Sequence, residues 1–246
     1  MDSTSSERND PQRPGTLPAD EVRRVFAAIV PRYDLLNCLL SFGLVLSWRR
    51  AAARMLPRGA ALVVADLCAG TGDLTAALAR RLGLQARVFG VDFCEPMVHR
   101  AQQKFGRLPC AAFVVGDALR LPLADGQFDA ATMAFGLRNV ADARQVLAEM
   151  LRVVRPRGQV LILDFCLPRG RATRAVCRFY FRRLLPLIGR VVSGHGFAYS
   201  YLPASVERFL SPEQLASLLE AAGAAEVTVR RLAGGVALLL AARKSG

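Results

Sequence analysis

The segment Val64–Arg80, VADLCAGTGDLTAALAR, constrains the fold more than any other part of the chain. It reads as an apolar strand, an acidic residue, a turn that contains Gly70 and Gly72, and an amphipathic helix. Glycines in such a turn let the backbone approach a ligand closely, because they carry no Cβ atom. The order strand, turn and helix therefore predicts one unit of an α/β fold with a ligand at the turn.

The glycine-rich turn matches neither of the two common nucleotide-binding loops. A phosphate-binding loop requires Gly-Lys-Ser/Thr, whereas Gly72 is followed here by Asp73. A dinucleotide-binding turn offers a helix N-terminus without acidic neighbours to a pyrophosphate. Here Asp66 and Asp73 make the mouth of the site, the entrance beside the glycine-rich turn, acidic. An acidic mouth suits a ligand that has a cationic centre and no phosphate. S-adenosylmethionine, with its sulfonium and amino group, has this chemistry, and we expect Thr71 to contact it.

Two later acidic residues stand where a nucleoside would need them. Asp92 lies in the strand-like run Arg87–Phe93, about twenty residues beyond Gly72, which is the spacing at which a carboxylate accepts both ribose hydroxyls. Asp117 follows another apolar run and can accept the adenine amino group, while Ala118 leaves room for the ring. A glycine turn alone also fits a plain strand–helix corner. The glycine turn followed by Asp92 and Asp117 in this order predicts a site for S-adenosylmethionine.

The chain, with 246 residues of which 52% are hydrophobic, can bury one full core. Strand-like runs alternate with helical stretches, which predicts a doubly wound α/β fold with a mostly parallel sheet. We expect a disordered tail over residues 1–20 and a single domain over residues 21–246, which begins with a helical cap at about 21–57. The expected strands are Leu62–Leu67, Arg87–Phe93, Ala112–Gly116, Phe128–Phe135, Gln159–Phe165, Glu226–Leu232 and Val236–Arg243.

Local signals predict two helices and a closing hairpin. Asp142–Val154 has apolar residues at helical spacing, and the turn Arg155–Gly158 separates it from the next strand. Ser211 before Pro212 reads as an N-cap followed by proline at the first helical position. The pair Gly234-Gly235 joins the last two strands as in a hairpin.

The net charge of +13 comes almost entirely from arginine. Such an excess suits nucleic acid or an anionic membrane surface, and a solvated arginine-rich surface is the third interpretation. The six cysteines form no CxxC pair, and neither they nor the two histidines have metal-site spacing. We therefore expect reduced thiols in a cytoplasmic protein that holds no metal. No apolar run is long enough for a transmembrane helix.

The stretch Arg171–Val192 interleaves arginines with aromatic and leucine residues. An amphipathic basic stretch of this kind can lie on an anionic bilayer, and a core-packing helix with a solvated arginine face is the alternative. We expect peripheral contact with the inner face of a membrane and no nucleic-acid partner, because the fourth strand leads into AFGLRN rather than an Asn/Asp-Pro-Pro-aromatic tetrapeptide. A homodimer is left open.

Two motifs are more specific than the glycine turn: YDLLN at Tyr33–Asn37 and FGLRN at Phe135–Asn139. Together with DLCAGTGDLT, LRVVRPRGQVLILDF and SPEQLASLLEAAG, they make the chain from about Val22 to Arg243 resemble the ubiquinone/menaquinone biosynthesis C-methyltransferases (the UbiE/MenG family). The resemblance implies a Rossmann-like seven-stranded sheet with an antiparallel C-terminal edge hairpin. It also implies S-adenosylmethionine as donor and a polyprenylated quinol, either demethylmenaquinol or the benzoquinol precursor of ubiquinone, as acceptor.

The same resemblance suggests which residues handle the quinol. It assigns Arg138 and Asn139 to the quinol oxygen, directly or through water. An arginine holds its proton at neutral pH, so we expect Arg138 to stabilise a developing phenolate while water takes the proton. Tyr33 either orients the ring or keeps a structural hydroxyl, with Asp34 holding the local helix–loop geometry. His195 is either an acid/base group or an exposed loop histidine.

The chain departs from the family pattern in three places. Ala134 stands where relatives commonly have a serine that lines the cofactor site. The closing strand reads Ala237-Leu238-Leu239 and lacks a histidine that is frequent there, and Cys68-Ala69 replaces the usual Gly or Thr. These departures leave a methyltransferase for another aromatic small molecule as the alternative, with a nucleic-acid methyltransferase as a more distant one.

Overall fold

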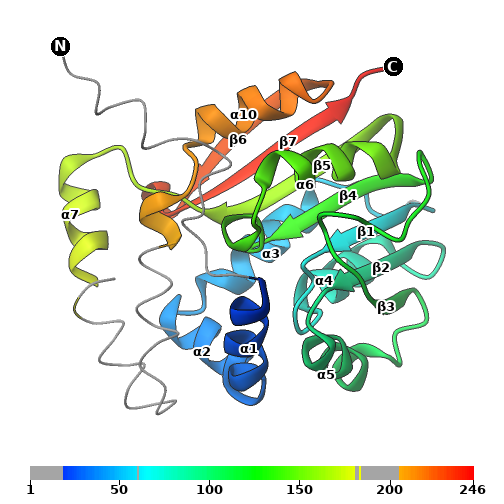
Figure 1. Cartoon of the computed structure of the whole chain (residues 1–246), viewed down its shortest axis with the longest axis horizontal. Coiled ribbons are helices and arrows are strands. Elements are labelled where there is room, and N and C mark those ends of the chain that lie inside the picture. The colour runs from blue at the N-terminus through cyan, green and yellow to red at the C-terminus, as the bar shows by residue number, and fades with distance from the viewer. Residues whose placement is uncertain (1–18, 60, 181–182, 184–204) are drawn as a thin grey trace.

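A seven-stranded sheet, in the order β3-β2-β1-β4-β5-β7-β6, forms the centre of the molecule (Figure 1). The computed structural model describes residues 19–59, 61–180, 183 and 205–246. Neighbouring strands from β3 to β5 run parallel, and β7 pairs antiparallel with both β5 and β6. The predicted, mostly parallel sheet with an antiparallel hairpin at its edge is confirmed. The strands are β1 (Val63–Leu67), β2 (Arg87–Asp92), β3 (Ala111–Val115), β4 (Phe128–Ala134), β5 (Val154–Phe165), β6 (Ala224–Leu232) and β7 (Ala237–Lys244).

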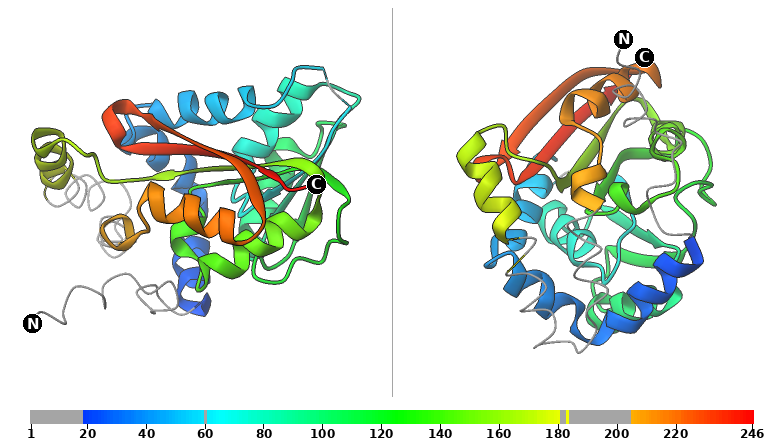
Figure 2. Two further views of the ribbon diagram at one scale, coloured as in Figure 1. Left: turned by 90° about the horizontal axis from the view of Figure 1, so that it is seen from above. Right: turned by 60° about the vertical axis from the view of Figure 1, so that its left-hand side comes forward.

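Helices cover both faces of this sheet, as Figure 2 shows from two further directions. The α-helices are α1 (Ala19–Ile29), α2 (Tyr33–Leu40), α3 (Leu44–Arg54), α4 (Asp73–Leu82), α5 (Glu95–Phe105), α6 (Ala143–Val153), α7 (Arg171–Phe179) and α10 (Pro212–Ala221). Short 3₁₀ segments are η2 (Val30–Arg32), η3 (Leu137–Asn139) and η5 (Ala233–Gly235). The helical cap expected before the first strand is therefore formed by α1, η2, α2 and α3.

The core follows from the alternation of side chains along the strands. On one face, Leu161 of β5 packs with Trp48 of α3 and Leu78 of α4. On the other face, Ile162 packs in a second cluster with Leu147 of α6, to which α10 also contributes. Each fully buried leucine or isoleucine stabilises the fold by about 1.5–3 kcal/mol, so these two layers fix the helices against the sheet.

Two predicted helix starts are confirmed by their capping bonds. The Asp142 carboxylate accepts hydrogen bonds from the backbone N–H groups of Arg144 and Gln145 at the start of α6. Ser211 and Gln214 form a reciprocal capping box at the start of α10, with Pro212 in the first turn. Such caps satisfy N–H groups that the helix itself leaves without partners.

The predicted turn Arg155–Gly158 is instead part of β5, which begins at Val154. The pairing of β4 with β5 shifts register between Phe128 and Ala130, so the strand continues through an irregularity. Arg157 has a positive φ of 61°, and a Cβ at Gly158 would lie 2.8 Å from the Asp129 carbonyl oxygen. A proline and a glycine mark this irregularity in the sequence, but they do not end the strand.

Several expectations fall on residues outside the described ranges. These are residues 1–18 of the predicted tail, His195, and most of Arg171–Val192 beyond α7. The last two residues of the predicted tail, Ala19 and Asp20, begin α1. Among the described helices, none is by itself both long and apolar enough to span a bilayer. The stretches Asp20–Leu40 and Leu44–Arg54 meet the length and composition test only as a pair, with a bend of 92° between them.

Candidate functional site

A cavity opens where β1, β2 and β4 end, beneath the helices of the cap. It encloses about 880 Å³, counted out to its open mouth. Its wall is mostly apolar, with Val22 and Phe26 from α1 and Met97 from α5 among the contributors. Of the predicted site residues, Tyr33, Gly70, Asp92, Asp117, Ala118 and Asn139 line this cavity. The ends of parallel strands and the N-terminal cap thus meet at the predicted ligand site.

A smaller cavity of about 310 Å³ lies beside the glycine-rich turn. It contains the predicted residues Asp66 and Thr71 together with Arg49 of α3. Both cavities have Tyr33 and Gly70 in their walls, so they adjoin at the turn. Two predicted site residues, Gly72 and Arg138, line neither cavity.

The two glycines of the turn have different tasks. Both have positive φ, 55° at Gly70 and 83° at Gly72, a conformation that side chains with a Cβ rarely adopt. A Cβ at Gly72 would lie 2.7 Å from the Phe113 ring and 3.0 Å from the Ala101 Cβ. Gly72 therefore permits α4 to pack closely against its neighbours, whereas Gly70 forms the wall of both cavities.

Asp92 is held at the end of β2 with its carboxylate facing the larger cavity. Its two oxygens accept hydrogen bonds from the backbone N–H groups of Gly70 (2.8 Å) and Cys94 (2.9 Å). Burial raises the pKa of this carboxyl, and the two amides oppose the rise. Each oxygen has a further lone pair, so the carboxylate can still accept two hydroxyl groups. The carboxylate thus has acceptor capacity left in the cavity wall, and its contact with a ribose stays a prediction.

The predicted adenine contacts also line the larger cavity. Asp117 is exposed, and its Oδ1 accepts a hydrogen bond from the Leu119 backbone N–H at 2.9 Å. Ala118 is buried, with 8% of its surface exposed. The carboxylate of Asp117 is therefore fixed in direction by its own turn, while the small side chain beside it leaves the cavity open.

Asp66 is fully buried between two threonines. Its carboxylate accepts hydrogen bonds from the hydroxyls of Thr75 (2.6 Å) and Thr132 (2.8 Å). Burial raises the pKa of Asp66 to about 6, although both hydroxyls and the nearby Arg49 guanidinium oppose the rise. The carboxyl can therefore change its charge close to neutral pH.

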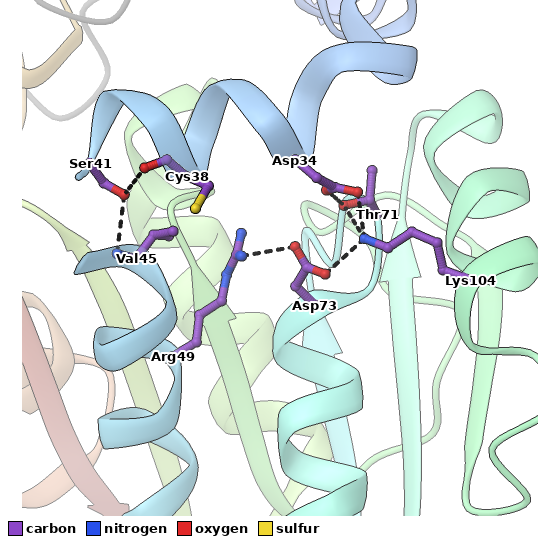
Figure 3. Close-up of polar contacts among 8 residues, drawn as sticks. All are labelled: Asp34, Cys38, Ser41, Val45, Arg49, Thr71, Asp73 and Lys104. Carbon is purple, nitrogen blue, oxygen red and sulfur yellow. Dashed lines mark hydrogen bonds and ion pairs between the residues drawn. The ribbon is translucent and has the colours of Figure 1, made fainter. Parts of the chain in front are cut away.

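The other acid of the expected acidic mouth, Asp73, is neutralised. Its two oxygens bind Arg49 at 2.8 Å and Lys104 at 2.7 Å (Figure 3). Lys104 also binds Asp34 at 2.6 Å, and Thr71 donates its hydroxyl proton to the same Asp34 carboxylate. The expectation that Asp73 gives the turn negative charge is corrected by these contacts. Asp34 ties α2 to the turn, as its predicted structural role requires.

Tyr33 lies over the turn, with Gly70 beneath its ring. A Cβ at Gly70 would be 3.8 Å from the Tyr33 ring, and Phe26 packs edge-on at 6.0 Å between ring centroids. Burial raises the pKa of the Tyr33 hydroxyl, while a hydrogen bond with the Asn37 side chain opposes the rise. The phenol therefore stays protonated at neutral pH, where it can donate a hydrogen bond but cannot act as a base.

Arg138 is placed differently from the sequence expectation. Its Nη1 donates to Asp164 Oδ1 at 2.9 Å and to the Phe135 carbonyl oxygen. The guanidinium also stacks over the Phe165 ring, 5.2 Å from its centroid. Because Asp164 is fully buried, this ion pair holds Arg138 inside the protein and away from the cavity. The sequence predicts that Arg138 contacts the quinol oxygen directly or through water. This arrangement does not support a direct contact, and a contact through water stays a prediction.

Asn139 does reach the larger cavity. Its Nδ2 donates to the Phe135 carbonyl oxygen at 3.2 Å, and its buried Oδ1 has no hydrogen-bond partner among the described residues. A buried acceptor without a partner costs about 1–3 kcal/mol. Since Asn139 lines the cavity, the missing donor is expected to belong to a ligand there.

Sequence reasoning missed Arg49 and Lys104. They lie on α3 and α5, far in sequence from the turn that they contact. One signal was present for Lys104, which is one of only two lysines in a chain rich in arginine.

The fold and the site together define a class of enzyme. The antiparallel β7 beside an otherwise parallel sheet, the glycine turn after β1, and the amide-held carboxylate after β2 fit S-adenosylmethionine. The protein is an S-adenosylmethionine-dependent methyltransferase. Residues 15–244 match the model of the ubiE/COQ5 methyltransferase family, and the chain belongs to this family.

Curated relatives cover most of the chain. A demethylmenaquinone methyltransferase of Deinococcus radiodurans is 47% identical over 82% of this chain and 84% of its own. The demethylmenaquinone methyltransferase of Thermus thermophilus is 46% identical over 81% and 90%. A ubiquinone/menaquinone biosynthesis C-methyltransferase of Geobacter sulfurreducens is 39% identical over 93% and 90%.

Solved structures agree with the fold. An S-adenosylmethionine-dependent methyltransferase of Aquifex aeolicus superposes with a TM-score of 0.56 at 22% identity, covering 76% of this chain and 84% of its own. One from Thermotoga maritima has a TM-score of 0.64 at 20% identity, covering 90% and 99%. At these identities the likeness concerns the fold alone.

Proposed function

We propose that this methyltransferase methylates a ring carbon of a polyprenylated quinol, with demethylmenaquinol as the acceptor. The observation that carries the proposal is the mostly apolar cavity whose wall contains both predicted donor residues, such as Asp92, and a polar acceptor, Asn139 Oδ1, that has no partner among the described residues. An apolar wall with a few polar groups suits a hydrophobic ring that carries hydroxyls. The relatives at 47% and 46% identity are named for demethylmenaquinone, which favours a naphthoquinol.

The residues on the two sides of the cavity have complementary tasks in this reaction. S-adenosylmethionine, when bound, supplies a methyl group on a sulfonium, which is a good leaving group. Asn139 Oδ1 accepts a hydrogen bond from a quinol hydroxyl, and the protonated Tyr33 hydroxyl can donate a hydrogen bond to a ring oxygen. A quinol that loses its hydroxyl proton becomes more nucleophilic at the adjacent carbon. The ring carbon that gains the methyl group also loses its own hydrogen as a proton, which restores the aromatic ring. We assign both this proton and the hydroxyl proton to water, because Tyr33 is protonated and Asn139 is neutral. The protein then contributes mainly by holding the two partners in line.

Arg138 acts in this account as a positioning residue. It donates to the same Phe135 carbonyl oxygen as Asn139 does, and its ion pair with Asp164 anchors η3 to the end of β5. A rigid η3 keeps the Asn139 amide in the cavity wall. This proposal replaces a direct contact between Arg138 and a phenolate, which is one of the two forms of contact that the sequence predicts.

Product analysis tests the proposed acceptor. The purified enzyme is incubated with S-adenosylmethionine and, separately, with demethylmenaquinol, the benzoquinol precursor of ubiquinone, and a catechol without a prenyl chain. We expect one added methyl group on a ring carbon of demethylmenaquinol. Methylation of the catechol with no methylation of either quinol would contradict the proposal.

A specific observation favours a second candidate. Ala134, which stands where relatives commonly have serine, lines both cavities. The missing hydroxyl makes the place where the two cavities adjoin more apolar. A methyltransferase for another aromatic small molecule would be consistent with this change, and the catechol arm of the same assay tests it.

We further propose that α2 and α7 face an anionic membrane, where a polyprenyl quinol resides. Phe42, just after α2, is 77% exposed, and Phe179 of α7 is 60% exposed. The Tyr180 ring packs on Phe42, and its hydroxyl donates to the Leu40 carbonyl oxygen at 2.6 Å, which joins the two helices. Arginines on α7 add positive charge to this apolar face.

Vesicle flotation tests this membrane contact. Wild-type protein is expected to float with vesicles that contain anionic lipid and to stay behind with neutral ones. Phe42→Asp and Phe179→Asp are expected to weaken binding, whereas Leu84→Asp, at an exposed apolar position elsewhere, serves as the control. Equal flotation of all variants would contradict the proposal. A homodimer stays a prediction, which sedimentation analysis would test.

A further inference from the structure

Lys104 of α5 binds acceptors from three other parts of the chain. Its Nζ lies 2.6 Å from Asp34 Oδ2 on α2, 2.7 Å from Asp73 Oδ1 at the start of α4, and 3.3 Å from the Thr71 hydroxyl oxygen in the glycine-rich turn (Figure 3). A protonated lysine has three N–H donors, so these acceptors satisfy the whole ammonium group. The Lys104 cluster, which consists of these four residues, therefore joins a cap helix to the turn.

The contacts of the Lys104 cluster close into a ring through the turn. The Thr71 hydroxyl donates to Asp34 Oδ1, while Asp34 Oδ2 accepts from Lys104. Thr71 is buried, and 18% of the Lys104 side chain is exposed. Burial would raise the pKa of Asp34, but hydrogen bonds from Lys104 and Thr71 hold this pKa below its ordinary value. Asp34 is thus ionised at neutral pH and binds both partners as a carboxylate.

The residue before Asp34 in the chain reaches the site itself. Tyr33 begins α2, and its ring lies over Gly70 in the wall of both cavities. The other end of α2 is tied to α3, because the Ser41 hydroxyl accepts a hydrogen bond from the Val45 backbone N–H at 3.2 Å. Since α2 has only eight residues, contacts that fix Asp34 at its start also fix Tyr33 over the turn.

We propose that Lys104 is a positioning residue for methyl transfer, which fixes Tyr33 over the donor site by binding Asp34 and the turn together. Lys104 lines neither cavity, so it acts through Tyr33 and not by contact with the reactants. A ligand that orders the turn then also orders α2, which links donor binding to order in the cap. The part played by Tyr33 toward the acceptor rests on the function proposed above, whereas the link between the turn and α2 does not.

Hydrogen exchange tests this link without any acceptor. Mass spectrometry follows the backbone amides of residues 33–40 in the full chain, with and without saturating S-adenosylhomocysteine, which is the donor without its methyl group. In the wild type, the ligand should slow their exchange by at least about threefold. In Lys104→Met the amides should exchange faster in both states, and the slowing by the ligand should be lost. Asp73 keeps its ion pair with Arg49 in this variant, so the start of α4 stays anchored.

Three further variants separate the link from a general loss of stability. Gln103→Met changes the exposed neighbour of Lys104 on α5 and should behave as the wild type does. Asp34→Asn removes the charge on the cap side and leaves the ion pair between Lys104 and Asp73, so it should behave as Lys104→Met does. Lys104→Arg should restore part of the slowing, because a guanidinium can still bind two carboxylates but has a different shape.

A double-mutant cycle tests whether Lys104 acts through Tyr33. Lys104→Met should lower kcat for demethylmenaquinol about tenfold, as expected for a small misplacement of a reacting group. Its dissociation constant for S-adenosylhomocysteine, measured by calorimetry, should change less than about threefold. In a Tyr33→Phe background, Lys104→Met should lower kcat by less than about twofold, because the hydroxyl that it positions is absent.

The exchange data and the cycle decide different parts of the proposal. The link is overturned if the ligand fails to slow α2 in the wild type, or if it slows α2 equally in Lys104→Met and Asp34→Asn. Asp34→Asn gives this result by itself if Lys104→Met does not fold. Additive effects of Lys104→Met and Tyr33→Phe on kcat would overturn the positioning role. If the wild type does not methylate demethylmenaquinol, the proposed function fails, and the cycle is run with the acceptor that is methylated.

Discussion

Arg138 and Asn139 donate hydrogen bonds to one and the same acceptor, the carbonyl oxygen of Phe135. Beyond this shared acceptor, the two side chains have different surroundings. Arg138 continues inward to the buried Asp164, and Asn139 lies in the wall of the larger cavity. A buried ion pair is therefore connected to the acceptor site through a single backbone group, and this connection separates the expected effects of the two side chains.

Arg138→Ala should destabilise the protein and lower turnover. Removing one partner of a buried ion pair leaves an uncompensated charge and costs about 3–5 kcal/mol. Turnover should fall about a hundredfold, comparable with the loss of one oriented polar group. Urea unfolding and initial rates at saturating donor measure the two effects. A stability close to wild type would contradict the structural part of this account.

The double variant Arg138→Met with Asp164→Leu separates stability from positioning. With both charges removed, no buried charge is left without a counter-charge, so part of the lost stability should return. The rest should not, because the backbone N–H groups of Arg138 and Phe165 lose the Asp164 carboxylate as their acceptor. Turnover should stay low, because the ion pair that anchors η3 to β5 is gone and, of the two side chains, only that of Asn139 still donates to the Phe135 carbonyl oxygen. Recovery of both stability and turnover would argue against a positioning role for Arg138.

Asn139→Ala, in contrast to Arg138→Ala, should lower turnover without lowering stability much. Because Asn139 Oδ1 has no partner among the described residues, its removal should change the free energy of unfolding by less than about 1 kcal/mol. Turnover should drop by about a hundredfold if this oxygen orients the quinol hydroxyl. Donor affinity, measured by calorimetry, should change little. A large loss of stability with normal turnover would assign Asn139 to the fold.

Asp92→Ala should weaken donor binding by at least about tenfold, or about 1.4 kcal/mol. The carboxylate both accepts the Gly70 and Cys94 amides and faces the cavity. Asp92→Asn is the comparison variant, since it keeps an oxygen for one amide but loses the charge. Calorimetric affinities for S-adenosylhomocysteine equal to wild type in both variants would remove Asp92 from the donor site.

Donor affinity should depend on pH through Asp66, whose pKa of about 6 is raised by burial. Above this pKa the Asp66 carboxylate is ionised and attracts the α-ammonium group of S-adenosylhomocysteine. It is protonated below the pKa, so affinity for S-adenosylhomocysteine should fall about tenfold per pH unit there. The ligand 5′-methylthioadenosine keeps the nucleoside and the sulfur of S-adenosylhomocysteine but has no ammonium group. It therefore controls for a titration of the Asp92 carboxyl, which would affect the binding of both ligands. A pH profile that is the same for both ligands would contradict the contact with Asp66.

The sequence predicted best what local chemistry determines. The caps at Asp142 and Ser211, the glycine turn, and the position of Asp92 at the end of β2 all depend on residues close in the chain. Parallel pairing then brings Asp92 beside Gly70, because β1 and β2 are neighbours in the sheet. These features follow from short-range rules and from the order of the strands.

The remaining features depend on contacts between distant residues. The direction of the Arg138 side chain is set by Asp164 on the neighbouring strand, and no local pattern reveals that pairing. Arg49 and Lys104 meet at Asp73 only because α3, α4 and α5 pack on one side of the sheet. A charged residue in an amphipathic helix predicts a solvated face, so tertiary packing had to show which of these charges are buried.

The most direct test of the account is methyl transfer to reduced and oxidised demethylmenaquinone with S-adenosylmethionine that carries a deuterated methyl group. Mass spectrometry of the extracted quinones then reports the label and its position. The account predicts one labelled methyl group on the ring carbon of the reduced quinol and a negligible product from the oxidised quinone, whose ring carbon is electrophilic. Equal labelling of both forms, or no labelling of the quinol by enzyme that binds the donor, would contradict it.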